Sequence, residues 1–278
     1  MKKLVIIDIN NFIYRAYFGI QQRLTAPDGT PVNAVYGVFN MIHRLLLNLQ
    51  PTTVVVAQDS RQSLRKELYP QYKENRSKMP EDLIKQVSII NDMLKFMNLT
   101  LIESPGYEAD DIVNSLVKSF HSQFDEIYIA SGDKDLMQLV DSKVKCVDTM
   151  KDKIYGISDV EEKLGVNPKQ VLDFLALLGD SSDNIPGVKG VGEKTAVKLI
   201  KEYGSINELY KKIDQLPEGK LKEKLTAQES EARLSYNLAQ LKLVQLPDSL
   251  PLYSKETSPE LIQLLEKLNM KSSLSKLI

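Results

Sequence analysis

Short apolar runs that each end next to an aspartate constrain the fold of this chain more than any other feature. The runs at 4–7, 54–57 and 127–132 lead into Asp8, Asp59 and Asp133. Runs of this length predict buried strands, and the segments between them have helical apolar spacing, at 33–49, 80–97 and 108–120. Strands separated by helices predict a parallel sheet covered on both faces. Ligands bind at the carboxyl edge of such a sheet, so we expect the three aspartates to share one site.

The pattern changes beyond about residue 157, where short helices are broken by glycine and proline and no strand is evident. Helices are expected at 171–178 and 194–203, a solvated connection at 214–224, and an amphipathic helix after the proline-rich stretch 247–259. The sequence therefore predicts an α/β domain at 1–157 and a helical lobe at 158–278. A chain of 278 residues, 42% hydrophobic, is long enough to bury a full core in either arrangement.

Cysteine content and apolar run lengths exclude several protein classes. The single Cys146 rules out an intrachain disulfide and a zinc site of several thiolates, which fits a reducing compartment, and cytoplasm is the expected location. No apolar run is long enough to span a bilayer, and the run after Met1 is too short for a signal peptide. The net charge of -1 does not exclude a nucleic-acid partner, because bases concentrate at 61–78 and 185–224.

Acidic residues gather in three glycine-containing motifs, at 106–111, 131–135 and 179–187. Each motif has an ordinary explanation: acids favour helix N-termini, aspartate caps helices, and Asp and Ser favour turns. Their joint occurrence beside apolar elements favours a site for hard divalent ions such as Mg²⁺ or Mn²⁺, which prefer oxygen ligands. The predicted metal-site residues are Asp8, Asp59, Glu108, Asp110, Asp111, Asp133, Asp135, Asp180 and Asp183.

Two basic segments accompany the acids. The glycines at 187, 190 and 192 predict a helix-hairpin-helix over about 177–203, whose backbone N–H groups would bind phosphates. A plain helix connection is the alternative. The segment 61–78 carries six bases and two tyrosines, and it follows Asp59 directly. By itself it would be an ordinary solvated helix, but its position predicts that it rises beside the metals, where tyrosine could stack on unpaired bases.

These motifs, together with Tyr14–Tyr17, Val35–Val38 and Tyr72–Arg76, resemble the 5′-3′ exonuclease and flap endonuclease family, and most closely the N-terminal nuclease domain of bacterial DNA polymerase I. The resemblance implies a PIN-like (resolvase-like) α/β fold with a mostly parallel sheet, a helical arch at about 61–80 and a C-terminal helix-hairpin-helix lobe. It also implies structure-specific cleavage at 5′ ends, flaps, nicks and RNA primers, in primer removal and DNA repair.

By the same resemblance, Asp8, Asp59, Glu108 and Asp110 match ligands of a first metal, and Asp135, Asp180 and Asp183 match ligands of a second, with Asp111 and Asp133 assigned to neither. The arch residues Tyr72, Lys73 and Arg76 match catalytic positions. Residues expected to contact DNA are Arg15, Arg65, Gly187, Lys189, Gly190, Gly192, Lys194 and Lys198. A K⁺ ion would be bound by backbone carbonyls of Leu177, Leu178, Pro186, Val188 and Val191. Ile9 and Gln58 depart from residues common in the family without removing a ligand.

The sequence thus predicts a monomeric nuclease that hydrolyses phosphodiesters with two Mg²⁺ ions, for which Mn²⁺ can substitute. A PIN-type ribonuclease and a non-catalytic DNA-structure binding module of the same fold are the alternatives. A haloacid-dehalogenase-type phosphatase would need a second aspartate where Asn10 stands. The sequence leaves open the preference between exonuclease and flap cleavage, and whether the chain is a stand-alone enzyme or an excised polymerase domain.

Overall fold

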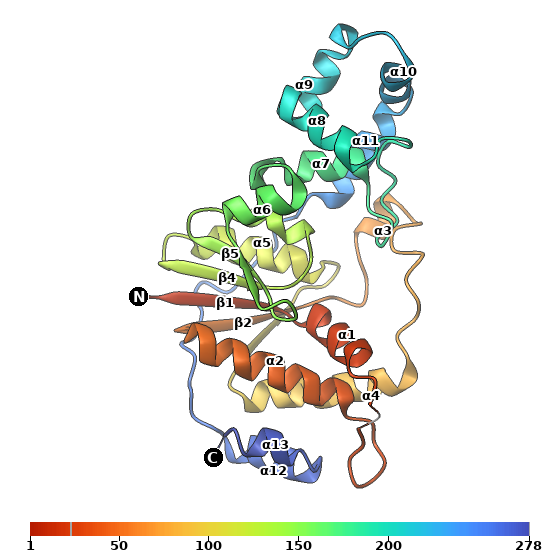
Figure 1. Ribbon diagram of the computed structural model, residues 1–278. Helices are drawn as coiled ribbons and strands as arrows, with labels where there is room; N and C mark the ends of the chain where they lie inside the picture. Colours follow the sequence, from red (N-terminus) through yellow and green to blue (C-terminus); the bar gives the residue numbers. More distant parts are fainter. Residues whose placement is uncertain (23, 278) are drawn as a thin grey trace.

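The computed structural model describes residues 1–22 and 24–277, and it has a six-stranded sheet at its centre (Figure 1). The strand order is β3-β2-β1-β4-β5-β6, and all neighbours run parallel except the β5–β6 pair. The strands are β1 (Lys3–Asp8), β2 (Thr53–Gln58), β3 (Thr100–Glu103), β4 (Glu126–Ala130), β5 (Val144–Asp148) and β6 (Lys153–Tyr155). The mostly parallel α/β sheet that the sequence predicted is confirmed.

Helices cover both faces of the sheet because side chains of successive residues in a strand point to opposite faces. Val5 and Ile7 of β1 pack with one group of helices, whereas Leu4 and Ile6 pack with α5 on the other face. The first group is α1 (Ile9–Gly19), α2 (Asn33–Leu49) and α4 (Glu81–Phe96), and α5 spans Ala109–Phe120. Burial on both faces explains why β1 and β2 read as continuous apolar runs.

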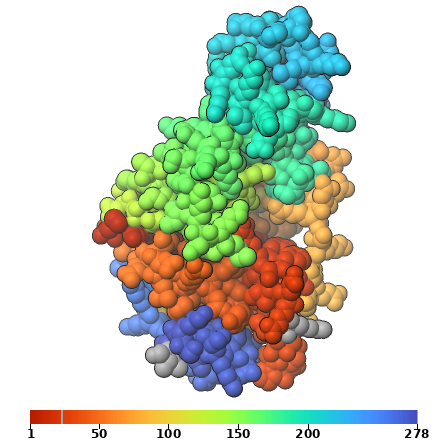
Figure 2. Space-filling view, viewed as in Figure 1, coloured from red at the N-terminus to blue at the C-terminus, as the bar shows by residue number. Residues whose placement is uncertain are grey.

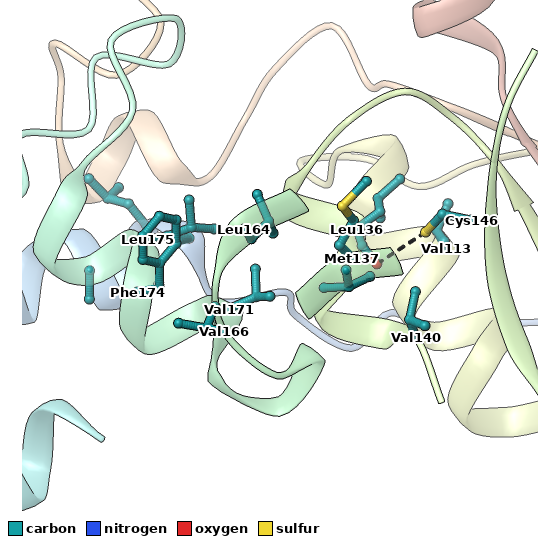
Figure 3. Close-up of a cluster of buried hydrophobic side chains, with 14 of the residues drawn as sticks. Val113, Leu136, Met137, Val140, Cys146, Leu164, Val166, Val171, Phe174 and Leu175 are labelled. Carbon is teal, nitrogen blue, oxygen red and sulfur yellow. Dashed lines mark hydrogen bonds between the residues drawn. The ribbon is translucent and has the colours of Figure 1, made fainter. Parts of the chain in front are cut away.

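The helical lobe lies beyond the β4–β5 side of the sheet (Figure 1). It contains α6 (Ile157–Leu164), η2 (Pro168–Gln170), α7 (Val171–Leu178), α8 (Glu193–Tyr203), α9 (Ile206–Lys211), η3 (Ile213–Gln215), α10 (Lys220–Ala227) and α11 (Glu229–Ala239). One apolar cluster runs from the sheet into this lobe. In Figure 3, Val113, Met137 and Cys146 on the sheet side continue into Val171 and Phe174 on the lobe side. The two parts therefore share one hydrophobic core.

Several local expectations were wrong or incomplete. The helix α1 and the strands β5 and β6 were not predicted. The arch segment 61–80 is mostly turns and extended chain, with only the short helix α3 (Arg65–Leu68) and no long helix. The segment 214–224, expected to be a solvated connection, contains part of η3 and the start of α10. A 3-10 helix, η1 (Asp135–Leu139), follows β4.

The C-terminal segment 253–277 packs on the α/β domain, although we had placed it in the helical lobe. It contains α12 (Pro259–Lys267) and α13 (Lys271–Leu274), which contact α4 and α2. Leu261 and Leu265 enter the apolar cluster of β1 and α2, and Tyr253 donates its backbone N–H to the carbonyl of Thr52 at 2.9 Å. Figure 2 shows this blue segment against the orange surface of the N-terminal part. The apolar face of α12 determines this placement. In the described ranges, no helix combines the length and apolarity that crossing a membrane requires.

Candidate active site

The carboxyl ends of β1, β2 and β4 bring the predicted aspartates to one edge, as the sequence implied. Asp8 is the N-cap of α1 and accepts hydrogen bonds from the backbone N–H of Asn11 at 3.2 Å and from Ser131 Oγ at 2.8 Å. Asp59 accepts the backbone N–H of Ala109 at 2.7 Å. A cavity of about 810 Å³ opens at this edge. Four of the predicted acids line it, namely Asp8, Asp59, Asp110 and Asp133.

Burial and mutual repulsion act on these carboxylates together. Burial raises the pKa of Asp8 to about 7, and the neighbouring charge of Asp59 adds to the rise. Burial also raises the pKa of Asp110 well above its usual value, and Asp133 and Asp8 raise it further. Each group disfavours the ionised form of the next. A cation bound among these acids would relieve this repulsion.

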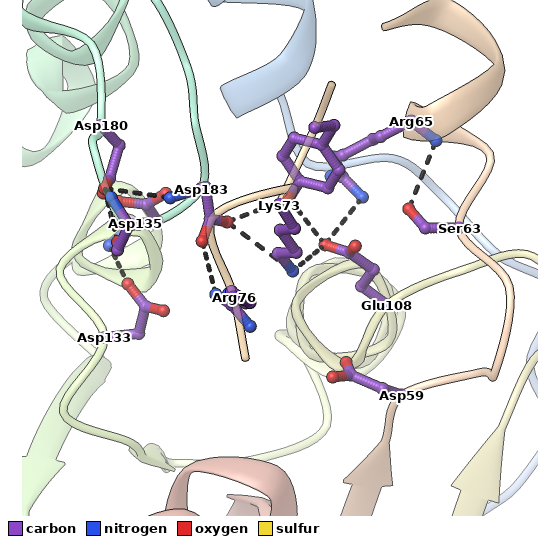
Figure 4. Close-up of polar contacts among 12 residues, drawn as sticks. Asp59, Ser63, Arg65, Lys73, Arg76, Glu108, Asp133, Asp135, Asp180 and Asp183 are labelled. Atoms are coloured by element: carbon purple, nitrogen blue, oxygen red, sulfur yellow. Dashed lines mark hydrogen bonds and ion pairs between the residues drawn. The ribbon is translucent and has the colours of Figure 1, made fainter. Parts of the chain in front are cut away.

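A second acidic group lies beside the first, where η1 meets the loop after α7 (Figure 4). It consists of Asp135, Asp180 and Asp183. Among the described residues, Asp135 Oδ1 is a buried oxygen without a hydrogen-bond partner. Burial and the charge of Asp133 raise the pKa of Asp135. Asp180 instead pairs with Lys134 Nζ at 2.7 Å, and this ammonium lowers its pKa although burial opposes the change.

The arch segment passes over Glu108 and Asp183 and places cations against both carboxylates. Lys73 Nζ donates to Glu108 Oε2 at 2.8 Å and lies 3.6 Å from Asp183 Oδ2. Tyr72 Oη donates to the same two oxygens, at 3.0 Å each, and Arg76 pairs with Asp183. Lys73 has φ 56°, and its backbone N–H donates to the carbonyl of Asp183 at 2.9 Å. Tyr72 is buried, with 2% exposure, so it does not present a stacking face.

Asp111 and Arg65 pair with each other, and neither fits its predicted role. The Arg65 guanidinium donates to both Asp111 carboxylate oxygens, at 2.7 and 2.8 Å. Asp111 is fully buried and also accepts the backbone N–H groups of Glu108 and Lys242. With both oxygens occupied, Asp111 does not face the cavity as a metal ligand would. Arg65 is 7% exposed and therefore does not face DNA. Sequence reasoning misassigned both residues because their pairing spans distant segments.

The donor set of the edge fits a hard divalent cation. In the ranges 1–22 and 24–277, no three His, Cys, Asp or Glu side chains converge into a ready metal-binding group, and Lys73 and Lys134 lie against carboxylates there. The oxygen donors around the cavity are carboxylates, amides and hydroxyls. The cations of Arg15, Lys73, Arg76 and Lys78 also line it, and no thiol or imidazole of the described residues does. Oxygen-rich sites of this kind suit Mg²⁺ or Mn²⁺. The unpartnered Asp135 oxygen and the raised pKa values of Asp8 and Asp110 are the observations that support this fit.

The glycine hairpin between α7 and α8 uses several of its backbone groups internally. The N–H of Gly187 donates to Ser235 Oγ at 2.9 Å, and that of Lys189 donates to Gln228 Oε1 at 2.8 Å. These two amides are therefore not directed at a phosphate. Among the carbonyls expected to bind K⁺, that of Leu177 accepts Val188 N–H at 2.8 Å and that of Val188 accepts Val191 N–H at 2.9 Å. Lys194 and Lys198 lie on α8, and Gly190 and Gly192 precede it.

Several residues of the site were not predicted. Asn10 and Asn11 line the cavity, and Asn10 donates to Asp59. Their position directly after Asp8, at the start of a helix, was the signal that could have identified them. Arg15, which was predicted to contact DNA, lines the cavity too, but it pairs with Asp148 at 2.6 Å and lies against Gly132, where any side chain would collide with it. Ser131 holds Asp8 and also accepts the N–H of Asp133 at 3.1 Å.

Comparisons with known proteins agree with this arrangement. A model of the 5′-3′ exonuclease N-terminal resolvase-like domain matches residues 3–165, and a model of the 5′-3′ exonuclease C-terminal SAM fold matches residues 166–258. The DNA polymerase I of Caldicellulosiruptor bescii is 42% identical over 99% of this chain and 33% of its own length. This chain therefore spans about a third of that relative. The 5′-3′ exonuclease of Aquifex aeolicus is 35% identical, over 99% of this chain and 95% of that protein.

The fold is also similar to that of a solved nuclease. The flap endonuclease of bacteriophage T5, in a pseudo-enzyme-product complex with DNA and metal ions, superimposes with a TM-score of 0.73 and 23% identity, over 99% of this chain and 96% of that one. This likeness supports the fold alone. The two family models together with the Aquifex relative decide the assignment, and the chain belongs to the 5′-3′ exonuclease family.

Proposed function

We propose that the chain is a metal-dependent nuclease that hydrolyses DNA phosphodiesters from 5′ ends and at flaps or nicks, including RNA primers on DNA. The observation that carries this proposal is the convergence of acids from three strand ends and from the α7–α8 loop beside Lys73 and Arg76. Family membership and the exonuclease name of the Aquifex relative support it. We further propose that it acts as a monomer in primer removal and repair.

Two Mg²⁺ ions, or Mn²⁺ in their place, would be held by two sets of acids. The first set is Asp8, Asp59, Glu108 and Asp110, the second is Asp135, Asp180 and Asp183, and Asp133 is assigned to neither. Bound ions would supply an activated water and charge stabilisation for the leaving oxygen. Glu108 and Asp183 would exchange their contacts with Lys73 and Arg76 for metal contacts. Lys73 and Arg76 would then be free to bind the phosphate, and Tyr72 would orient Glu108 and Asp183 by its hydroxyl.

The helical lobe would hold the duplex through the hairpin. Gly190 and Gly192 leave room for close approach of the backbone, and Lys189, Lys194 and Lys198 would add charge. We keep residues 1–157 as the nuclease domain and 158–252 as the DNA-binding lobe, and assign 253–277 to the former because of its packing. The carbonyls of Leu178 and Pro186, with those of Leu177, Val188 and Val191, would form a K⁺ site. Arg15 would contact DNA at the rim of the cavity.

The proposal is tested with a 5′-flap substrate, labelled at each end, incubated with Mg²⁺, with Mn²⁺ and with a chelator. We expect cleavage near the flap junction in both metals and none with the chelator. The same assay on an all-RNA hairpin distinguishes a ribonuclease. Tight flap binding without cleavage in either metal would show a binding module instead of an enzyme.

A further inference from the structure

Buried side chains connect the end of the helical lobe to α5, the helix that carries Asp110 and Asp111. The chain passes between the two parts twice, once after β6 and once after α11. The first crossing is supported by the shared apolar core in Figure 3. The second crossing, residues 238–244, is here named the return segment. Its apolar side chains Leu238, Ala239, Leu241 and Val244 pack against the same core, and its backbone also makes polar contacts with α3 and α5.

Arg65 and Asp111 are the centre of these contacts. Besides its fork to Asp111, Arg65 donates from Nε to the carbonyl of Leu238 at 2.8 Å and from Nη2 to that of Gln240 at 3.2 Å. Asp111 Oδ1 accepts the backbone N–H of Lys242 at 2.8 Å. Each residue thus binds its partner and the return segment at once. The pair therefore links the base of the arch, α5 and the end of the helical lobe.

Two further side chains of α5 also bind the return segment. Asn114 Nδ2 donates to the carbonyl of Lys242 at 2.8 Å, and the backbone N–H of Val244 donates to Ser115 Oγ at 2.8 Å. Both side chains are 1% exposed. The contacts reach backbone atoms of the return segment, so they fix its position along α5 rather than the identity of its side chains.

The Arg65–Asp111 pair also contacts Glu108, an acid of the proposed metal site. Asp111 Oδ2 accepts the backbone N–H of Glu108, and Arg65 Nη1 lies 3.5 Å from Glu108 Oε2 (Figure 4). Glu108 is therefore held on one side by Arg65 and Asp111 and on the other by Lys73. A displacement of the return segment would move Arg65 and Asp111, and through them Glu108. Among the described residues, Arg65 and Asp111 thus connect the end of the lobe to Glu108 through one buried ion pair.

We propose that Arg65 and Asp111 are positioning residues that set which phosphodiester is cut, by fixing the distance between the DNA-binding hairpin and the acids. This inference rests on the proposed function. Successive phosphates of one strand advance about 3.4 Å along the duplex axis. A shift of a few ångströms between the lobe and α5 would therefore bring a neighbouring phosphodiester over the acids. Breaking the pair should spread the cleavage positions as well as slow the reaction.

Two variants test the pair without leaving an unpaired buried charge. Arg65→Lys keeps the charge but cannot form the fork, and Arg65→Met with Asp111→Leu replaces both partners by apolar side chains, which folded proteins often tolerate. Arg44→Ala is the matched control, because Arg44 forms an exposed pair with Asp152 away from the return segment. Thermal unfolding and circular dichroism confirm that each variant is folded before it is compared.

The first readout does not depend on activity. Spin labels at Asn48→Cys on α2 and Glu202→Cys on α8, both exposed sites, report the distance between the two parts, and the buried Cys146 does not compete for label. We expect a broader distance distribution in both Arg65 variants and an unchanged distribution in Arg44→Ala. An unchanged distribution in the folded double variant overturns the proposal.

The second readout is product length at single-nucleotide resolution on the flap substrate. We expect the fraction cut at the main position to fall several-fold and the turnover rate to fall about tenfold, since small misplacements of reacting groups are costly. A slower reaction at one unchanged position contradicts the proposal, because loss of stability or of Glu108 alone would give that result. If the wild-type protein cleaves with neither metal, the proposed function fails, and the distance measurement still decides whether the pair fixes the lobe.

Discussion

Two sets of ion pairs flank Glu108, and they differ in burial and in the number of hydrogen bonds they make. The Arg65–Asp111 pair is enclosed, with side-chain exposures of 7% and 1%, and both partners also bind backbone groups. The pairs that Lys73 and Arg76 make with Asp183 are more open, and Arg76 is 47% exposed. Both sets join segments that lie far apart in sequence. Both sets contact Glu108, but only the second set contacts Asp183 of the proposed metal site.

This difference separates a permanent contact from an exchangeable one. A buried pair with complete hydrogen bonding resists opening, because separating the partners leaves a charge without water or a counter-ion. A more exposed pair gains little from each contact and can be replaced by a competing cation. The arch is therefore fixed at its base near Arg65 and held at Lys73 and Arg76 by contacts that metal or DNA can replace.

The largest expected effect comes from removing an acid that belongs to neither set of ion pairs. Asp135→Ala should lower flap cleavage by roughly 10⁴-fold, because the proposed ion loses a ligand that cannot be replaced by water in the same geometry. DNA binding should be nearly unchanged or slightly tighter as negative charge is removed. Single-turnover rates and a gel-shift titration measure the two quantities. Near-normal turnover in saturating Mg²⁺ would falsify the metal-site assignment.

Breaking the enclosed pair should cost more stability than breaking the open one. Asp111→Ala leaves the Arg65 guanidinium buried and unpaired, so we expect a loss of about 3–5 kcal/mol in the free energy of unfolding. Asp183→Ala should cost about 1 kcal/mol or less, since the cations it pairs with can turn to water. Urea denaturation of both variants measures the difference. Equal losses would remove the distinction between the two sets.

The open set should show competition between its cations and metal. Lys73→Met should lower the single-turnover rate about 10²-fold, because an ammonium near the phosphate stabilises developing charge. The same change should raise Mg²⁺ affinity several-fold in the DNA-free protein, since Lys73 no longer occupies Glu108. Calorimetric titration measures the affinity, with Lys145→Met as the control because Lys145 pairs with Glu126 at the far side of the sheet. An unchanged affinity would mean that Lys73 and metal do not share Glu108.

The smallest effect concerns the hairpin, which makes neither kind of pair with the acids. Gly190 has φ 87°, and a side chain there would approach Lys224 Nζ to 2.5 Å, so Gly190→Val should disturb the turn. Binding of duplex-containing DNA should weaken several-fold at fixed ionic strength, and cleavage of single strands should be spared. Gly204→Val is the control, since Gly204 has φ 82° and lies outside the hairpin. Equal losses on both substrates would indicate that Gly190 supports the fold instead.

The sequence was sufficient for the strands β1, β2 and β4 and for the edge that carries the acids, because both depend on local patterns. Apolar runs identify buried strands, and Asp8 and Asp59 follow their strands within two residues. The assignments of Asp111 and Arg65 failed because their pairing joins positions 46 residues apart, and no local pattern reports it. The family resemblance implied a helical arch at about 61–80, yet tertiary contacts of Tyr72 and Lys73 with Glu108 and Asp183 determine its irregular path.

The C-terminal segment shows the same limit. Its amphipathic helix was evident, but the surface that it covers was not, because no local pattern reports that Leu261 and Leu265 join the cluster of β1 and α2. The strand β5 was missed because Lys145 interrupts its short apolar run, and β6 was missed because it has only three residues and begins with Lys153.

The apolar cluster that joins the sheet to the helical lobe has a consequence for how the protein denatures. Met137 of η1 and Phe174 of α7 belong to the same buried cluster, so exposing one part removes packing from the other. Separate domains joined by a linker lose structure independently, whereas parts with a common interior unfold cooperatively. Heating should therefore give one calorimetric transition for both parts.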